Sequence, residues 1–235
     1  MGISVAMAVY NGEKYIKEQI LSILKQLNCS DEIVISYDKS TDNTYRIISD
    51  LAVRDSRIKI FRGPSHGAIK NFENALLHCT NDYIFLSDQD DIWLDNKVSR
   101  VLSVFKNKHV DVVLHDCCVV NDKEDTIHPS FFKFRHCTPG FLFNLLHNSY
   151  IGCCMALKRD FLHQVLPFPE QIPMHDQWIG LIGEKKGKVA FIKSPLIKYR
   201  RHSNNASKLR HLTFKDMLRH RLNLICALFR HKKLS

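Results

Sequence analysis

The sequence predicts an α/β domain with a mostly parallel central sheet, followed by a basic C-terminal helix. Strand-like apolar runs alternate with amphipathic helical patterns through the first 120 residues, which is typical of βαβ units. The chain of 235 residues has an ordinary globular composition, with 45% hydrophobic and 25% charged residues. Ligands of such sheets bind beyond the carboxyl ends of the strands, so the residues that follow each strand are the candidates for a site.

The expected elements follow one another in a regular order. Apolar runs predict strands at residues 3–9, 33–37, 58–61, 83–86 and 110–120. Apolar residues at a 3.6-residue period predict helices at residues 12–27, 42–53, 68–79 and 94–107, with Asn11 as the N-cap of the first. Beyond Asp122 the pattern loosens into a Phe-rich stretch, a proline-bounded loop at 167–173 and a short strand at 189–192. This half is expected to complete the sheet and to shape a pocket.

The end of the chain is strongly basic. Residues 200–235 hold ten Lys and Arg against the single Asp216, which accounts for most of the net charge of +10. An amphipathic helix is predicted there by an apolar stripe of Phe214, Leu218, Leu222, Ile225 and Phe229. We therefore expect a catalytic-size domain at 1–205 and a helical tail at 206–235 that meets an anionic membrane surface. The alternatives are a solvated face, packing on the domain, or the seam of a homodimer.

Membrane spans and disulfide bonds are not expected. No apolar run reaches the roughly 18 residues of a membrane span, and no secretory signal precedes the first strand. The expected location is the cytoplasm, peripherally associated with the inner face of the cell membrane. The eight Cys are expected to be reduced thiols in the core. The adjacent pairs Cys117-Cys118 and Cys153-Cys154 lie in strand-like runs, where neighbouring side chains point to opposite faces and do not easily share a metal.

Three carboxylates follow the fourth predicted strand within four positions: Asp88, Asp90 and Asp91. Such like charges repel one another unless something neutralises them, and Mg²⁺ or Mn²⁺ prefers carboxylate oxygens together with substrate phosphates. The alternative is a helix N-terminus, where acidic residues interact favourably with the dipole. That alternative accounts for one or two acids but not for three beside a strand end, so we expect a divalent metal site.

Asp38 follows the second predicted strand and therefore lies at the same edge of the sheet. A carboxylate there can accept hydrogen bonds from a pyrimidine N–H or a ribose hydroxyl, while Thr41 or Asp42 is expected to cap the next helix. The sequence contains neither a Gly-x-Gly-x-x-Gly segment nor a Walker lysine loop. A metal is therefore expected to carry the phosphate contacts.

Several segments together resemble the family 2 glycosyltransferases of the GT-A fold, and most closely the bacterial polysaccharide branch with its rhamnosyltransferase-like members. The segments are Val9-Tyr10-Asn11-Gly12, the turn at 38–44, Lys70-Asn71-Phe72, residues 87–93 and His175-Asp176-Gln177-Trp178. The resemblance covers about residues 3–205. It implies inverting transfer of a sugar from a nucleotide donor, with the metal held by an Asp-Xaa-Asp motif that Asp88 and Asp90 match.

The resemblance also implies roles around the donor. The implied donor-binding residues are Val9, Asn11, Asp38, Lys70, Asp88, Arg200 and Arg201, and the implied metal ligands are Asp88, Asp90 and His202. Asp38 would contact the base, Asp88 the ribose and the metal, and Asp90 chiefly the metal. Residues 199–205 are similar to a family loop that closes over the donor diphosphate, where the guanidinium groups of Arg200 and Arg201 suit phosphate geometry. For Lys70 the alternative is a solvated helix position.

Asp176 matches the family's general base, which takes the proton of the acceptor hydroxyl as its oxygen attacks C1. The alternative for Asp176 is a helix N-cap after Pro173. His175 and Trp178 are expected to line the acceptor pocket, with core packing as the alternative for each. Gly152 resembles an acceptor-side position, which packing explains equally well.

The combined prediction is a metal-dependent, inverting glycosyltransferase that acts on a lipid-linked saccharide in bacterial cell-surface polysaccharide synthesis. UDP-hexose is the first expected donor and dTDP-rhamnose the second. A sugar nucleotidyltransferase is the alternative enzyme, but residues 8–12 lack the Gly-rich basic loop that it would need. A nucleic-acid-binding module is the other alternative. Phe214 and Phe229 lie on the apolar stripe of the tail rather than among its basic residues, so no nucleic acid partner is expected.

Overall fold

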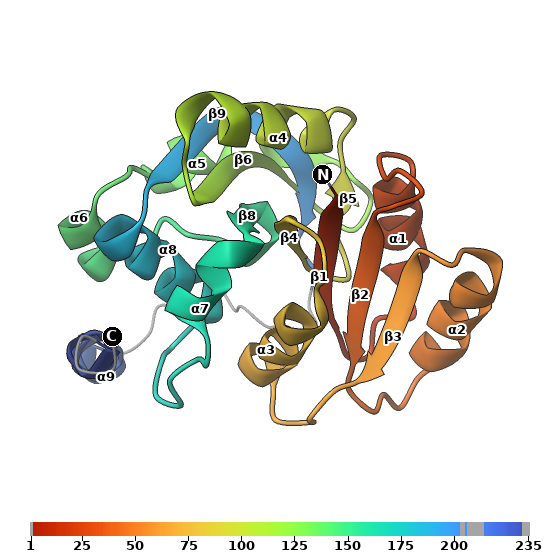
Figure 1. Cartoon of the computed structure of the whole chain (residues 1–235), viewed down its shortest axis with the longest axis horizontal. Coiled ribbons are helices and arrows are strands. Elements are labelled where there is room, and N and C mark those ends of the chain that lie inside the picture. Colours follow the sequence, from red (N-terminus) through yellow and green to blue (C-terminus); the bar gives the residue numbers. More distant parts are fainter. Residues whose placement is uncertain (1, 203–204, 206–213, 232–235) are drawn as a thin grey trace.

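A curled sheet runs through the chain and carries helices on both of its faces (Figure 1). The computed structural model describes residues 2–202, 205 and 214–231. Its strands form one nine-stranded sheet in the order β3-β2-β1-β4-β8-β6-β9-β5, with β7 paired to β6 beside this path. The predicted α/β fold is confirmed, and the sheet is mixed. Four strand pairings are parallel and four antiparallel in the part of the chain that the structure describes.

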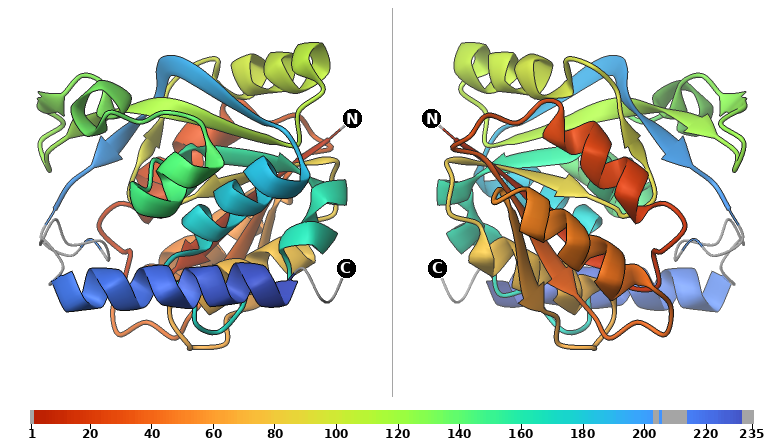
Figure 2. Two further views of the ribbon diagram at one scale, coloured as in Figure 1. Left: turned by 90° about the vertical axis from the view of Figure 1, so that its left-hand side faces the viewer. Right: turned by 90° about the vertical axis from the view of Figure 1, so that its right-hand side faces the viewer.

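The N-terminal half is the parallel part of the sheet. Its elements are β1 (Ile3–Val9), α1 (Ile16–Leu24), β2 (Glu32–Tyr37), α2 (Thr44–Arg54), β3 (Ile58–Arg62), α3 (Ala68–His78) and β4 (Tyr83–Ser87). Helices α1 and α2 cover one face, and α3 returns across the other to reach β4, as right-handed crossovers require (Figures 1 and 2). Strands β1, β2 and β4 are buried on both faces, which is why each is a continuous apolar run.

The C-terminal half adds mostly antiparallel strands and short helices. Its elements are β5 (Ile92–Trp93), α4 (Lys97–Lys108), β6 (Val112–Val120), β7 (Thr126–His128), α5 (Phe131–Arg135), α6 (Phe141–Leu146), η1 (Gly152–Cys154), β8 (Met155–Lys158), η2 (Arg159–Phe161), α7 (Leu162–Val165), α8 (His175–Lys186), β9 (Val189–Arg200) and α9 (Phe214–His231). Strand β8 lies antiparallel between β4 and β6, whereas β6 and β9 are parallel. This half therefore joins the N-terminal sheet through β8.

The predicted start of the first helix and its predicted N-cap are both wrong. Helix α1 begins at Ile16 instead of residue 12, because the Gly12 carbonyl accepts hydrogen bonds from Tyr15 and Ile16 in a preceding turn. Asn11 does not cap it. Its side-chain Oδ1 accepts a hydrogen bond from the Thr41 backbone at 2.9 Å, which ties the end of β1 to the loop after β2.

Two predicted strands also differ from the structure. Strand β9 extends to Arg200 rather than ending at residue 192, and it includes Pro195, which cannot donate to a ladder. Register shifts in β6 on both sides of Asp116, the partner of Pro195, accommodate this residue. Cys153 and Cys154 lie in the short helix η1 rather than in a strand, and both are fully buried.

Helix α9 packs along α8 and the end of α6. The Lys185 ammonium donates to the Leu228 carbonyl at 3.0 Å, and the Arg221 guanidinium donates to the Leu146 carbonyl at 3.0 Å. The His231 ring meets the edge of Trp178 at a centroid distance of 5.3 Å. Within the described ranges, no helix combines the length and the apolar character that crossing a membrane requires.

Candidate active site

The carboxyl ends of β1, β2 and β4 meet at one edge of the sheet. Register places Val9 beside Tyr37 and Met7 beside Ser87, so the residues after each strand converge. Gln89 reinforces this meeting, because its side-chain amide donates to the Tyr10 carbonyl at 2.8 Å and accepts from the Tyr10 amide at 3.0 Å. The edge expected from the sequence is therefore assembled from β1, β2 and β4.

Asp38 directly follows β2 at this edge and is buried. Its Oδ1 accepts a hydrogen bond from the Ser65 backbone at 2.8 Å. A Cβ on Gly63 would lie 2.3 Å from that same oxygen, so only glycine allows the chain after β3 to pass so close. The Val9 carbonyl accepts from the Asp38 amide at 2.9 Å, while the Val9 side chain is buried in the core. Asp38 follows β2 and is thus held by contacts with the end of β1 and with the segment after β3.

Asp88, Asp90 and Asp91 form an acidic cluster at the end of β4. Desolvation, followed by the charges of Asp90 and Asp176, raises the pKa of Asp88 to about 7. Burial and the charges of Asp90 and Asp88 raise the pKa of Asp91 well above its usual range. One Asp91 carboxylate oxygen is buried without a hydrogen-bond partner among the described residues. The described side chains therefore do not fully stabilise the charged forms of these carboxyl groups, which favours protonation of Asp91 when no cation is present.

The segment after β9 closes on Asp90. The His202 imidazole Nε2 lies 2.9 Å from Asp90 Oδ2, and the Asn205 amide donates to that oxygen at 3.2 Å. The His202 ring is stacked on Tyr15 at a centroid distance of 4.8 Å. Asp90 and His202 are therefore brought together from segments far apart in the sequence.

Arg200 lies beside the acidic cluster in the structure. Its side chain is only 4% exposed and pairs with Glu18 at 2.7 Å. Its Nε donates to the Asp90 carbonyl at 3.1 Å, and its backbone amide donates to Asp91 Oδ1 at 3.0 Å. In this structure the guanidinium is buried and paired with Glu18, and the contact of Arg200 with a donor diphosphate stays a prediction. Arg200 holds the acidic cluster in place from the end of β9.

The residues of the cluster fit a hard divalent cation. Ligand atoms of Asp88, Asp91 and Cys153 lie within 4.8 Å of one another. Carboxylate oxygens are the ligands that Mg²⁺ and Mn²⁺ prefer, whereas burial holds the pKa of the Cys153 thiol well above its usual range and keeps it protonated. Of the predicted ligands, Asp88 belongs to this group, whereas Asp90 and His202 lie in contact with each other at 2.9 Å.

Lys97 lies beneath the cluster, and the sequence-based interpretation did not single it out. Its side chain is fully buried, donates to the Cys153 carbonyl at 3.0 Å, and lies 3.9 Å from the centroid of the Trp93 ring. Burial lowers its pKa to about 8, and its charge acts on both Asp88 and Asp91. A signal for it exists in the sequence, because Lys97, Val101 and Phe105 share one face of α4 at a spacing of four residues. A lysine on that apolar stripe has its Cα on the buried face of the helix, which the spacing alone indicates.

Replacing Lys97 with Met is expected to tighten Mn²⁺ binding by about tenfold, because removing a buried positive charge relieves its repulsion of the cation. Calorimetric titration with Mn²⁺ measures the change, and cooperative melting verifies that the variant is folded. Lys108→Met is the matched control, since this exposed lysine ends the same helix and its loss should leave Mn²⁺ affinity unchanged. Unchanged or weaker Mn²⁺ binding by Lys97→Met would show that its charge does not oppose the ion.

Asp176 lies in the first turn of α8, beside the acidic cluster. It is 6% exposed, and its two oxygens accept hydrogen bonds from the Gly152 amide at 3.1 Å and the Gln177 amide at 2.6 Å. Burial raises the pKa of Asp176 to about 6, although these backbone donors favour the charged form. Its charge is close enough to raise the pKa of Asp88. Asp176 therefore has a fixed orientation, and its carboxylate titrates near neutral pH.

The residues predicted to contact the acceptor are packed behind Asp176. Trp178 is fully buried and its indole donates to the Val165 carbonyl at 2.9 Å, which agrees with core packing, the alternative expected for this residue. The His175 ring stacks on Phe72 at 4.2 Å, and its nitrogens are shielded without hydrogen-bond partners among the described residues. Burial lowers the pKa of His175 to about 3, so the ring is neutral. Gly152 holds Asp176 through its amide, and the His175 ring packs on Phe72.

The remaining predicted residues lie at the margin of the edge. Asn11 is exposed and its backbone amide donates to the Ser40 hydroxyl at 2.9 Å. Lys70 forms an ion pair with Glu73 on α3, and its side chain remains 37% exposed. Arg201 donates to the Tyr199 hydroxyl at 3.1 Å. The predicted contacts of Asn11, Lys70 and Arg201 with the donor therefore remain predictions.

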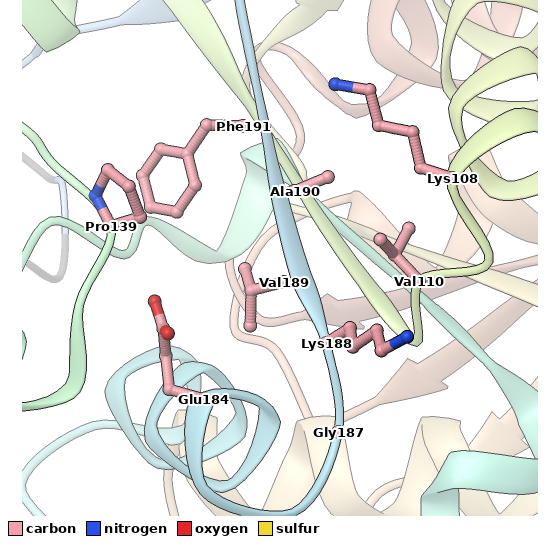
Figure 3. A pocket seen from close by; sticks show the side chains of 9 residues that line it. All are labelled: Lys108, Val110, Pro139, Glu184, Gly187, Lys188, Val189, Ala190 and Phe191. Atoms are coloured by element: carbon pink, nitrogen blue, oxygen red, sulfur yellow. The ribbon is translucent and has the colours of Figure 1, made fainter.

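A separate pocket lies away from this edge, at the beginning of β9 (Figure 3). It is lined by Lys108, Val110, Pro139, Glu184, Gly187, Lys188, Val189, Ala190 and Phe191. Val189 begins β9, whereas Arg200 at the other end of the strand contacts the acidic cluster. None of the predicted site residues lines the pocket, so it is not the site described above.

Comparison with known proteins identifies relatives over most of the chain. The model of glycosyl transferase family 2 matches residues 4–166. The dTDP-rhamnosyl transferase RfbG of Shigella flexneri is 29% identical over 222 residues, covering 85% of this chain and 72% of RfbG. The Escherichia coli enzyme WfgD, named as UDP-Glc:alpha-D-GlcNAc-diphosphoundecaprenol beta-1,3-glucosyltransferase, is 27% identical over 220 residues, covering 92% of this chain and 83% of WfgD.

Other matches cover two thirds or less of the length of the similar protein. An uncharacterised glycosyltransferase of Nostoc is 27% identical over 173 residues, which are 71% of this chain and 54% of that protein. Among solved structures, S. aureus TarS 1-349 in complex with UDP-GlcNAc superposes with a TM-score of 0.72 at 19% identity. The superposition covers 96% of this chain and 66% of the TarS chain. At this level of identity the likeness shows a shared fold.

Proposed function

The chain belongs to glycosyl transferase family 2, and we propose that it transfers a sugar with inversion from a nucleotide-sugar donor to a lipid-linked saccharide. The observation that carries the proposal is the position of Asp176 beside the acidic cluster. Its carboxylate is anchored to Gly152, whose neighbour Cys153 lies within 4.8 Å of Asp88 and Asp91. A candidate base and a candidate metal site thus share one edge of the sheet, the edge at which α/β sheets bind ligands.

The proposed reaction assigns a role to each part of this edge. Asp176 accepts the proton of the acceptor hydroxyl while the hydroxyl oxygen forms a bond to C1 of the donor sugar. The bond between C1 and the diphosphate oxygen breaks, and the nucleoside diphosphate leaves on the opposite face. A Mg²⁺ or Mn²⁺ ion, when bound, supplies positive charge for that leaving group. Asp88, Asp90 and His202 would hold the ion. Arg200 would hold Asp90 and Asp91 in position through its hydrogen bonds.

Donor recognition is proposed to begin at Asp38, which would accept hydrogen bonds from the base. Asn11, Lys70 and Arg201 complete the proposed donor site at its margin. UDP-hexose is the preferred donor and dTDP-rhamnose the second. WfgD and RfbG, by their names, use UDP-glucose and a dTDP-rhamnosyl donor, so each candidate has a relative among the similar proteins.

The proposed acceptor is a saccharide on a lipid diphosphate, in the synthesis of a bacterial cell-surface polysaccharide. The name of WfgD describes such an acceptor, which supports this class without identifying the sugar or the linkage. We further propose that residues 1–205 form the catalytic domain and residues 206–235 a tail that brings the site to the membrane, with the protein located at the inner face of the cell membrane.

A calorimetric and melting panel of UDP, GDP, dTDP and CDP with Mn²⁺ tests the donor proposal. One nucleotide, with UDP expected first, should raise the melting temperature, because a ligand at 100 times its Kd adds about 2.7 kcal/mol to the free energy of unfolding. Chelation of Mn²⁺ with EDTA should remove the effect. Binding of none of the four nucleotides in Mn²⁺ would contradict the proposed function.

A further inference from the structure

Helix α9 packs on the protein through a face different from the predicted apolar stripe. Leu224, Ala227 and Leu228 form the packed face and are 1%, 7% and 5% exposed. Leu218, Leu222 and Phe229 of the stripe are 47%, 53% and 70% exposed. The side chain of Phe214, the first residue of the stripe, lies outside the described part of the structure. The helix is therefore apolar on two faces, of which the protein covers one.

Helix α6 adds a second apolar surface beside it. Leu142 and Leu146 are 74% and 54% exposed, and Phe143 between them is 37% exposed. The Arg221 guanidinium of α9 donates to the Leu146 carbonyl at 3.0 Å, so the two helices are in direct contact. The left view of Figure 2 shows α6 and α9 on the same face of the molecule. We call the exposed apolar side chains of these two contacting helices, Leu142, Phe143, Leu146, Leu218, Leu222 and Phe229, the α6–α9 surface.

The charges around this surface favour an anionic partner. Lys215, Arg219 and Arg230 are exposed on α9, and Asp216, which lies 3.5 Å from the Arg219 guanidinium, is its single acidic residue. Lys232 and Lys233, which follow this helix in the sequence, lie outside the described residues. In a symmetric dimer, these like charges would face one another, whereas anionic headgroups complement them. A row of Leu and Phe flanked by Lys and Arg is the pattern of helices that lie in a membrane interface.

The α6–α9 surface is connected to the proposed base. The Gln177 side-chain amide donates to the Asn144 carbonyl of α6 at 3.0 Å, and Gln177 directly follows Asp176 in the first turn of α8. Helix α6 therefore touches the turn that carries Asp176. An acceptor whose lipid lies in a bilayer under α6 and α9 would have its sugar close to this turn.

We propose that the α6–α9 surface docks the protein onto an anionic lipid bilayer. This inference rests on the proposed function for the lipid-linked acceptor, and it names the lipid surface from which that acceptor would be taken. Leu142, Leu146, Leu222 and Phe229 enter the headgroup boundary, while Lys215, Arg219 and Arg230 meet lipid phosphates.

Co-sedimentation with vesicles tests the proposal. The full chain is expected to sediment with vesicles of phosphatidylcholine mixed with phosphatidylglycerol, to bind vesicles of phosphatidylcholine alone more weakly, and to dissociate as salt increases. The double variant Leu222→Glu/Phe229→Glu should lower the partition coefficient at least about tenfold, because burying even one such side chain corresponds to a change of that size.

The matched control is Leu21→Glu/Val53→Glu. Leu21 on α1 and Val53 on α2 are 42% and 88% exposed, so this variant makes the same change of charge at exposed apolar positions. These helices lie on the opposite face, as the two views of Figure 2 show. The control should bind anionic vesicles with a partition coefficient near that of wild type. The Leu222→Glu/Phe229→Glu variant should bind the same vesicles poorly.

Three outcomes would overturn the proposal. The first is equal sedimentation of wild type and Leu222→Glu/Phe229→Glu with anionic vesicles. The second is an equal loss in both variants, which would show a general effect of charge. The third is a lipid-free dimer that only Leu222→Glu/Phe229→Glu dissociates, which would make the surface a contact between copies. Calorimetry with UDP and Mn²⁺ separates these results from failure of the proposed function, since nucleotide binding should be retained in both variants.

Discussion

Replacing Asp176 with Asn is expected to lower turnover at least about 100-fold while nucleotide affinity in Mn²⁺ stays near wild type. The amide preserves the shape of the side chain but cannot accept the proton of the acceptor hydroxyl. Asp176 is held by the Gly152 and Gln177 amides rather than by the acidic cluster, so its replacement should leave the cluster in place. Single-turnover measurement of sugar transfer together with calorimetry of UDP binding checks both halves of this expectation.

The pH dependence of turnover provides a second readout for Asp176. Because burial raises its pKa to about 6, the unprotonated form required of a base is lost as pH falls through 6. Turnover at saturating Mn²⁺ should therefore fall about tenfold for each pH unit below that value. Saturating Mn²⁺ is needed since the pKa of Asp88, raised to about 7, would otherwise weaken ion binding over the same range. The residual turnover of Asp176→Asn should lack this decline.

Two variants bracket the result. Asp160→Asn makes the same chemical change at an exposed position and should behave as wild type. Gly152→Ala should lower turnover without changing nucleotide affinity, because a Cβ there would lie 2.9 Å from His175 Nε2 and disturb the amide that orients Asp176. Transfer by Asp176→Asn at a near wild-type rate would mean that another group removes the proton.

The parallel half of the fold could be predicted because its strands are buried on both faces. Strands β1, β2 and β4 leave long uninterrupted apolar runs in the sequence, and these were predicted to within a residue or two. Strand β8 is only four residues long and was not predicted. Strand β9 was shortened in the prediction because Pro195 interrupts its pattern, and only pairing with an irregular β6 allows a proline there.

The covered face of α9 could not be chosen from the sequence. Leu218, Leu222 and Phe229 define one helical stripe, while Leu224 and Leu228 define another. Both stripes have the spacing of a buried face, and periodicity does not say which of them meets the protein. The decision depends on contacts with α8 and α6, such as the hydrogen bond from Lys185 to the Leu228 carbonyl.

The acidic residues of the site were predictable because they follow strand ends at the edge where α/β sheets bind ligands. The partners of these residues were less predictable. Arg200 pairs with Glu18 across 182 positions of sequence, and a guanidinium that suits phosphate also suits a carboxylate. The sequence therefore identifies the type of group but not which anion it meets. Trp178 shows the same limit, because an indole serves a sugar-binding pocket and a core equally well.

Replacing Asp90 with Asn is expected to weaken Mn²⁺ binding and Mn²⁺-dependent UDP binding at least about 100-fold, because an amide ligand removes a negative charge that offsets the cation. Asp90 differs from Asp91 in its surroundings. Asp91 is 1% exposed and accepts the backbone amide of Arg200, whereas Asp90 Oδ2 faces the His202 imidazole at 2.9 Å. Loss of the Asp90 charge should therefore affect the ion more than the fold.

Calorimetry of UDP binding with Mn²⁺ and with EDTA distinguishes the role of this charge. Wild type should bind UDP strongly only in Mn²⁺, and Asp90→Asn should bind UDP weakly in both conditions. Asp95→Asn is the matched control, because it makes the same change at an exposed position five residues further along and should retain wild-type affinity. Equal UDP affinity of wild type and Asp90→Asn in Mn²⁺ would remove Asp90 from the metal site. In that case Asp88 and Asp91, whose ligand atoms lie within 4.8 Å of one another, would be the remaining carboxylates able to hold the ion.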